Sequence, residues 1–239
     1  MRNLREESFR ELFHGGRARP RYRNRSHAGR VLAESLKDLA GQPCTVLAVP
    51  NGGVPVGIEI ARALGAELGI ELVRKLQIPG NTEAGFGAMG LGGGVVLNRE
   101  LVFLLGLREA DIRKAQEATK EELERRRAEF GPVEAPVEGR VVVLTDDGLA
   151  SGYTMLAAVR SVRARSPSKI VVAVPTAPPE SVRMVGAEAD RIVCPDVRGG
   201  GPFAVADAYE DWYDLTTREA VEALAAFLSE RGLRGTNKH

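Results

Sequence analysis

The chain has 239 residues, which is long enough for one large α/β domain with an insertion, and its 33 basic residues nearly balance its 32 acidic ones. A formal net charge of +1 gives no general attraction to nucleic acid or to an anionic membrane. No apolar run is long enough to span a bilayer. Cys44 and Cys194 lack disulfide or metal-site spacing, so we expect a cytoplasmic protein.

The first 64 residues predict two helices around one buried strand. Residues 1–25 are polar and rich in Arg, and we expect them to be solvated. Ser26 is a candidate cap for a helix that continues to about residue 41. The apolar run at 45–49 predicts the first core strand. A turn at 50–55 with two adjacent glycines follows, and such a turn allows close approach of a ligand.

Residues 69–130 combine a strand, a glycine-rich segment and a charged helix. The strand at 69–73 ends in Arg74 and Lys75, a pair that suits an anion but is also common at solvated strand ends. Residues 77–94 are rich in glycine and predict a long mobile loop, such as a lid. Residues 98–130 predict a helical insertion with a solvated face. A subunit contact, as in a homodimer, is the alternative.

The stretch at 141–162 shows the strongest signal of a binding site. Four apolar residues at 141–144 predict a strand buried on both faces. Asp146 and Asp147 follow where that strand should end, and a loop of small residues then leads into a helix. A loop at a helix N-terminus gathers unpaired amide donors and favours an anion. We therefore predict a phosphate site at this loop.

The two carboxylates need a different role, because they would repel a phosphate. Ionised carboxylates accept hydrogen bonds, so Asp146 and Asp147 suit the hydroxyl groups of a ribose. Mg²⁺, which prefers oxygen ligands, could share them. Together the loop and the acids describe a ribose 5-phosphate site. The alternative is an ordinary exposed Asp-Asp-Gly turn.

Residues 146–154, Asp-Asp-Gly-Leu-Ala-Ser-Gly-Tyr-Thr, resemble the signature of the type I phosphoribosyltransferases, and the resemblance covers most of residues 20–215. It implies that Asp146 and Asp147 hold the ribose hydroxyls of phosphoribosyl diphosphate, with Mg²⁺ as cofactor. It also implies that the following loop holds the 5-phosphate. The residues of that loop are Gly148, Leu149, Ala150, Ser151, Gly152, Tyr153 and Thr154.

The same resemblance assigns the diphosphate to the turn of Asn51, Gly52 and Gly53, which in the family often contains a non-proline cis peptide. Arg74 and Lys75 would stabilise the leaving diphosphate. Related proteins usually have Arg before the two glycines, so Asn51 is a departure that removes a cation. The family also carries a flexible lid at the position of residues 77–94.

The remaining elements complete the expected fold. Strands are predicted at 169–174 and 191–194, with a helix at 181–188 between them. By resemblance, the tail at 195–239 contributes to a hood over a nitrogenous base, and Phe203 or Trp212 could stack on that base. The alternative is that these aromatic residues complete the core. Thr216 opens a final amphipathic helix. The prediction is a single α/β domain with a doubly wound parallel sheet, a lid, a helical insertion and a small hood.

The resemblance implies an enzyme of nucleotide metabolism that transfers the 5-phosphoribosyl group to a nitrogenous acceptor and releases diphosphate. The alternative is a regulatory protein of the same fold that binds a ribose phosphate without turnover, which Asn51 favours. Ala150 stands where members acting on 6-oxopurines have an acid, so that class of acceptor is disfavoured. An RNA-binding role rests only on the Arg-rich N-terminus, and we expect no nucleic acid partner.

Overall fold

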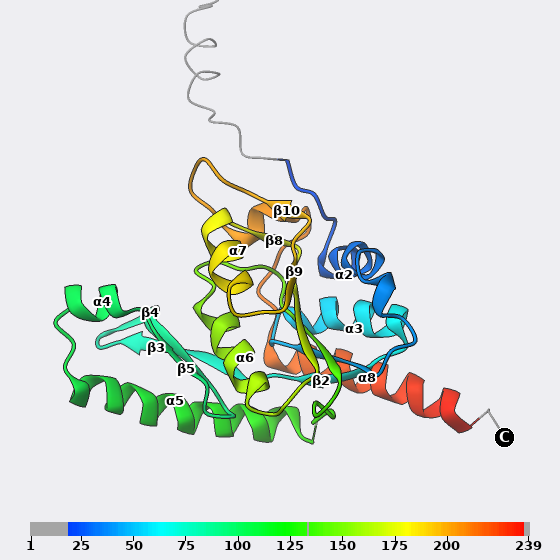
Figure 1. The fold of residues 1–239 in the computed structure, drawn as a ribbon, viewed down its shortest axis with the longest axis horizontal. Coiled ribbons are helices and arrows are strands. Elements are labelled where there is room, and N and C mark those ends of the chain that lie inside the picture. The colour runs from blue at the N-terminus through cyan, green and yellow to red at the C-terminus, as the bar shows by residue number, and fades with distance from the viewer. Residues whose placement is uncertain (1–18, 133, 237–239) are drawn as a thin grey trace, which may run out of the picture.

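A five-stranded parallel sheet forms the centre of the computed structural model, which describes residues 19–132 and 134–236 (Figure 1). The sheet order is β2-β1-β6-β7-β9. The strands are β1 (Cys44–Ala48), β2 (Glu67–Ile70), β6 (Val141–Thr145), β7 (Lys169–Ala173) and β9 (Arg191–Val193). The chain order reverses between β1 and β6, which is the point where open α/β sheets bind ligands. The predicted parallel α/β sheet is confirmed.

Helices cover both faces of this sheet because successive strand residues point to opposite sides. In β1, Val46 packs into a core with helices α2, α3 and α8, whereas Leu47 packs into a second core with α6 and α7. The sheet is therefore doubly wound, as predicted. These helices are α2 (Arg25–Glu34), α3 (Gly53–Leu64), α6 (Tyr153–Arg163), α7 (Pro179–Gly186) and α8 (Thr217–Thr236). A short 3-10 helix, η1 (Lys37–Leu39), follows α2.

Residues 73–130 form an arm that extends to the left of the central sheet in Figure 1. It contains an antiparallel sheet of β3 (Val73–Ile78), β4 (Asn81–Gly90) and β5 (Val95–Leu97). Two helices follow, α4 (Arg99–Leu104) and the long α5 (Glu109–Phe130), and α5 packs along β3. The side chain of Phe103 is 85% exposed, and a subunit contact through the arm stays a prediction.

The prediction of an irregular loop at 77–94 is wrong, because most of this segment is paired strand. Its glycines serve close packing. A Cβ atom at Gly87 would lie 2.3 Å from the carbonyl oxygen of Val96 on the neighbouring strand. One at Gly94 would lie 2.7 Å from the backbone nitrogen of Ser161 on α6. Side chains at these positions would separate the strands from each other or from α6. Closure of this hairpin over a ligand stays a prediction.

The strand expected at 69–73 is divided, since β2 ends at Ile70 and β3 begins at Val73. Arg74 and Lys75 consequently lie inside β3 and not at the end of a core strand. The two side chains therefore point to opposite faces of the arm sheet.

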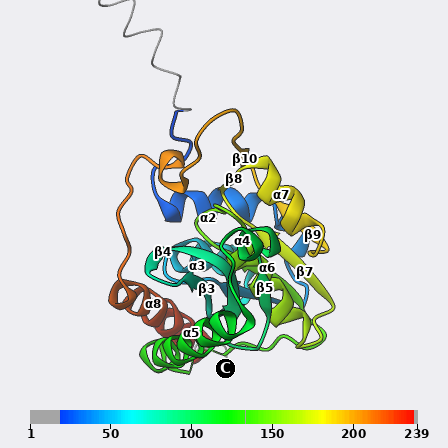
Figure 2. The ribbon, with the colours of Figure 1, turned by 90° about the vertical axis from the view of Figure 1, so that its left-hand side faces the viewer.

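A small hood lies above the carboxyl ends of the central strands, where Figure 2 shows it next to α2. It contains β8 (Thr176–Ala177) paired with β10 (Asp196–Val197), and the 3-10 helix η2 (Val205–Ala208). The region at 195–239, expected as a hood and tail, contributes β10 and η2 to this hood and ends in a helix. The last helix, α8, packs against α3 and α5, and its Leu224 and Phe227 belong to the core.

The N-terminal expectation is also corrected where the structure describes it, since residues 1–18 lie outside the described part. Tyr22 and Arg25 are buried, not solvated. Asn24, and not Ser26, caps α2, because its side-chain oxygen accepts a hydrogen bond from the His27 amide at 3.0 Å. Among the described residues, no helix combines the length and the apolar character that crossing a membrane requires.

Candidate functional site

Two loops meet at the switch point between β1 and β6. Gly53 packs so closely that a Cβ atom there would lie 2.8 Å from the carbonyl oxygen of Thr145. A Cβ atom at Gly52 would lie 1.9 Å from Oδ2 of Asp147. The peptide bond between Pro50 and Asn51 is cis, as the resemblance implied. The predicted diphosphate turn and the predicted ribose acids are therefore direct neighbours.

The two acids differ in their partners. Oδ1 of Asp146 accepts a hydrogen bond from the Asp147 amide at 2.8 Å, whereas Oδ2 of Asp147 lies 2.8 Å from Nε of Arg25. Burial raises the pKa of Asp146 well above its usual value, and the neighbouring Asp147 carboxylate raises it further. Burial also raises the pKa of Asp147, but the Arg25 guanidinium opposes that shift. Asp146 is consequently the acid that holds a proton more readily.

The predicted phosphate loop connects these acids to α6. Gly152 has a φ of +80° directly before that helix, a backbone conformation that favours glycine. The buried Leu149 donates its amide to a backbone carbonyl of β8, and Ser181 donates its hydroxyl to the carbonyl of Ala150 at 2.6 Å. These bonds hold the inner side of the loop and use the Leu149 amide within the fold. Ala150 itself is exposed, so the outer side is open to a ligand.

Ser151 is also exposed, while Tyr153 and Thr154 in the first turn of α6 are partly exposed. Gly148 is buried against Val205, where an added Cβ atom would lie 2.6 Å from a methyl carbon. In an α-helix the first amide groups have no partner inside the helix. The N-terminus of α6 and the exposed side of the loop thus present donors at one place, next to Asp146.

Asn51 contacts Arg126, a residue that the sequence did not assign to the site. Nδ2 of Asn51 donates to the carbonyl of Leu215 at 2.9 Å, and its Oδ1 accepts from Nη2 of Arg126 at 2.7 Å. Arg126 belongs to α5, a helix for which the sequence predicted a solvated face or a subunit contact. Its position in a charged run gave no signal of this contact, because only the tertiary fold brings α5 to the turn.

Arg74 and Lys75 are not equivalent in the structure. Arg74 forms an ion pair with Glu122 on α5, with 2.5 Å between Nη2 and Oε1. Glu122 lies four residues before Arg126 and so on the same side of the helix. Lys75 is exposed on the opposite face of β3. The structure thus brings Arg74 toward the Asn51 turn and leaves the role of Lys75 a prediction.

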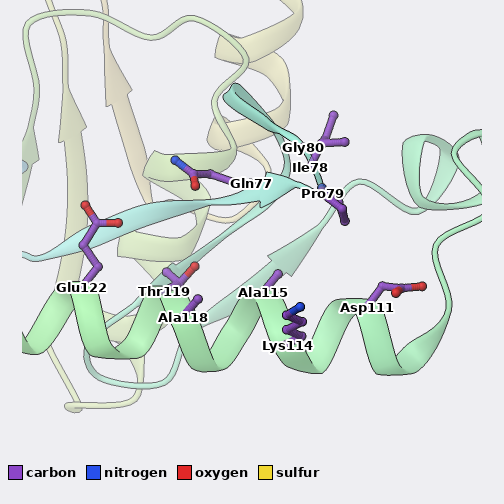
Figure 3. A pocket seen from close by; sticks show the side chains of 10 residues that line it. All are labelled: Gln77, Ile78, Pro79, Gly80, Asp111, Lys114, Ala115, Ala118, Thr119 and Glu122. Carbon is purple, nitrogen blue, oxygen red and sulfur yellow. The ribbon is translucent and has the colours of Figure 1, made fainter.

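Glu122 also lines a pocket of about 500 Å³ between the β3–β4 turn and α5 (Figure 3). Glu122 lies at one end of this pocket and the turn at residues 78–80 lies near the other. The pocket opens beside the arm and does not include the acids or the phosphate loop. None of the predicted site residues lines it.

Aromatic residues that follow η2 support the acids from the other side. Tyr209 donates its hydroxyl to the Asp147 carbonyl at 2.6 Å. The Arg25 guanidinium lies 4.0 Å from the ring centre of Trp212 and donates to the Tyr213 carbonyl at 3.0 Å. This face of Trp212 is occupied by Arg25, so the structure gives Trp212 a positioning role. The sequence missed Arg25 because it lies in a run of exposed-looking arginines.

A magnesium ion fits the donor set only together with substrate. In the described part of the chain, no group of three or more His, Cys, Asp or Glu side chains forms a metal site. Mg²⁺ usually binds one or two carboxylates and completes its shell with phosphate oxygens and water. Asp146 and Asp147 supply two carboxylates beside a candidate phosphate site. The residues therefore fit an ion that arrives with a phosphorylated ligand.

Comparison with known proteins agrees with this geometry. The phosphoribosyl transferase domain family matches residues 91–208, a range that contains both acids and the whole phosphate loop. A relative from Mycobacterium tuberculosis (strain H37Rv), named "Putative phosphoribosyl transferase Rv0571c", is 38% identical over 203 residues. This chain belongs to the phosphoribosyltransferase family. That match covers 84% of the chain but only 46% of the relative, so the chain spans about half of the length of this relative.

The fold of this chain is also matched by a solved structure. The crystal structure of TT1426 from Thermus thermophilus is 37% identical, with a TM-score of 0.73. The match covers 87% of the present chain and 99% of TT1426. Together with the family match, the parallel α/β sheet confirms the predicted type I phosphoribosyltransferase-like fold.

Proposed function

We propose that this phosphoribosyltransferase family member transfers the 5-phosphoribosyl group of phosphoribosyl diphosphate to a nitrogenous acceptor. One observation carries the proposal: the Gly52–Gly53 turn, the two acids and the loop before α6 meet at the switch point of the sheet. Three neighbouring sites for diphosphate, ribose and phosphate match the three parts of this substrate. The family membership supports the same reading.

Each part of the substrate has a stated partner in the proposal. The loop at 148–154 and the N-terminus of α6 hold the 5-phosphate through backbone amides and hydroxyl groups. Asp146 and Asp147 accept hydrogen bonds from the ribose hydroxyls. Asp147 can do so while it is paired with Arg25, because a carboxylate has about four acceptor sites. The diphosphate lies at residues 51–53 near Arg74.

In the proposed reaction, a nitrogen atom of the acceptor forms a bond to the anomeric carbon, and the bond from that carbon to the diphosphate oxygen breaks. The electron pair leaves with the diphosphate, and the proton of the acceptor nitrogen passes to solvent water. The residues orient the sugar and stabilise the charge on the leaving group. Bound Mg²⁺ would neutralise part of that charge. Ala150 has no proton to exchange, so this loop position does not protonate or deprotonate the acceptor.

The decisive experiment incubates the protein with phosphoribosyl diphosphate, Mg²⁺ and a panel of nucleobases, and measures diphosphate release. Release that depends on one acceptor supports the transferase. Saturable binding without release for any acceptor supports the alternative, a regulatory protein that senses a ribose phosphate. Absence of binding would overturn both proposals. The cytoplasmic location and a homodimer stay predictions from the sequence.

A further inference from the structure

Position 51 contains a neutral side chain, but a cation lies against it. Nη2 of Arg126 donates to Oδ1 of Asn51 at 2.7 Å, and the other end of the Asn51 amide is bound to the Leu215 carbonyl. The Asn51 side chain is therefore fixed by two hydrogen bonds, and one of them positions the Arg126 guanidinium. Residue 51 has no positive charge of its own, but Arg126, 75 positions later in the chain, places one next to it.

The guanidinium of Arg126 is held in place and has more hydrogen-bond donors than its contact with Asn51 uses. It is half-buried, and it lies 5.9 Å from the ring centre of Phe130, one turn further along α5. An arginine has five N–H donors, and one contact to Asn51 uses one of them. Within the described part of the chain this guanidinium makes no other hydrogen bond, so its remaining donors can serve phosphate oxygens, which match its planar fork.

The electrostatics of this cluster favour an anion. Burial and the nearby Arg74 guanidinium both lower the pKa of Arg126, while Glu122 and Glu129 oppose the shift. Two guanidiniums are thus close enough to repel each other, and Glu122 is engaged with Arg74 at 2.5 Å. An anion between the Asn51 turn and α5 would relieve this repulsion.

We propose that Arg126 is the diphosphate-binding cation of this protein and replaces the missing cation of position 51. This inference rests on the proposed function and deepens it. It also gives the helical insertion a role: α5 carries Arg126 to the turn and holds Arg74 through Glu122. The ligand class is the diphosphate group, either free or as part of phosphoribosyl diphosphate.

The test compares three variants by titration calorimetry with phosphoribosyl diphosphate, diphosphate and ribose 5-phosphate, each with Mg²⁺. Loss of a charge-assisted hydrogen bond in Arg126→Gln should weaken binding of the two diphosphate ligands by about tenfold or more. Ribose 5-phosphate should bind as in the wild type. Arg127→Gln is the control, because Arg127 is the next residue and pairs with Glu134 at 2.9 Å instead.

The third variant combines Asn51→Arg with Arg126→Gln and should regain the diphosphate affinity, since it returns the cation to the turn. Equal losses for all three ligands in Arg126→Gln, or unchanged affinities, would overturn the inference. A folded wild type that binds diphosphate but not phosphoribosyl diphosphate would overturn the proposed function and leave the role of Arg126 standing. Wild type that binds none of the ligands would overturn both.

Discussion

Nε of Arg25 lies 2.8 Å from Oδ2 of Asp147, and both side chains are largely buried, with 7% and 15% of their surface exposed. Arg25 begins helix α2 and Asp147 follows strand β6, so this ion pair joins the N-terminal helix to the candidate sugar site. It holds one of the two acids in place before any ligand binds.

Removal of Arg25 should destabilise the fold. Arg25→Met leaves the Asp147 carboxylate buried without its partner, and breaking a buried pair in this way costs about 3–5 kcal/mol. Urea unfolding measures the loss. Arg30→Met on the same helix is the control, because Arg30 is 54% exposed and its pair with Glu59 should contribute less than about 1 kcal/mol. Equal losses for the two variants would contradict a buried pair.

Neutralising Asp146 should separate sugar binding from phosphate binding. Asp146→Asn removes a charged acceptor, so binding of ribose 5-phosphate and phosphoribosyl diphosphate should weaken by about 1.5–3 kcal/mol. Sulfate has no sugar hydroxyl that donates to Asp146, so it should bind as well or better because one repelling charge is gone. Calorimetric titrations with the three ligands measure this. Parallel losses for sulfate and the sugars would show that the acid does not contact the ribose.

Binding should depend on pH through Asp146. Its pKa is raised in the folded protein, so it retains a proton to a higher pH than an ordinary aspartate does, whereas the hydroxyl donors of a ribose favour the ionised form. Affinity for phosphoribosyl diphosphate should therefore increase as the pH rises through the raised pKa and then level off. Binding should release protons, which calorimetry in buffers of different ionisation enthalpy detects.

The stability of the ligand-free protein should change in the opposite direction. The folded state binds the Asp146 proton more tightly than the unfolded chain, so its contribution to stability is fully present below the unfolded pKa. It is lost as the pH rises to the folded value. Asp146→Asn should flatten both pH profiles. Profiles that stay unchanged in this variant would assign the titration to another group.

The β3–β4 hairpin offers a test of lid closure. Amides at 86–90 lie in paired strand and should exchange slowly without ligand. Register shifts at Leu76–Gln77 and Gln77–Ile78 interrupt the ladder near the tip, so residues 78–85 should exchange faster. Saturating phosphoribosyl diphosphate with Mg²⁺ should slow exchange at the tip. Hydrogen exchange that is identical with and without ligand would exclude closure.

Much of the fold could be predicted because the central strands are short apolar runs that end in turns. Residues 45–49 and 141–144 both form buried strands of the sheet, close to the predicted bounds. The loops after them carry their polar residues to the same edge, which follows from a parallel sheet. This is why the acids and the Gly52–Gly53 turn could be assigned to one site from the sequence.

The arm and the two arginines of the site could not be predicted in the same way. Glycine-rich sequence normally indicates a loop, but here the glycines allow strands and α6 to approach, which depends on neighbours far away in the chain. Arg25 and Arg126 each lie in a charged run, where local pattern favours solvent exposure. Their partners Asp147 and Asn51 are 122 and 75 positions away, and such pairings appear only in three dimensions.

Three hydrogen bonds around the candidate site depend on residues near the end of the chain. Arg25 donates to the carbonyl of Tyr213, Asn51 donates to that of Leu215, and Tyr209 donates to that of Asp147. A chain leaves the ribosome from its N-terminus, and the parts of a site join only after the last of them has emerged. A growing chain that ends before residue 209 contains the sugar acids and the diphosphate turn but none of these three bonds. These three bonds can therefore form only after residues 209–215 have emerged.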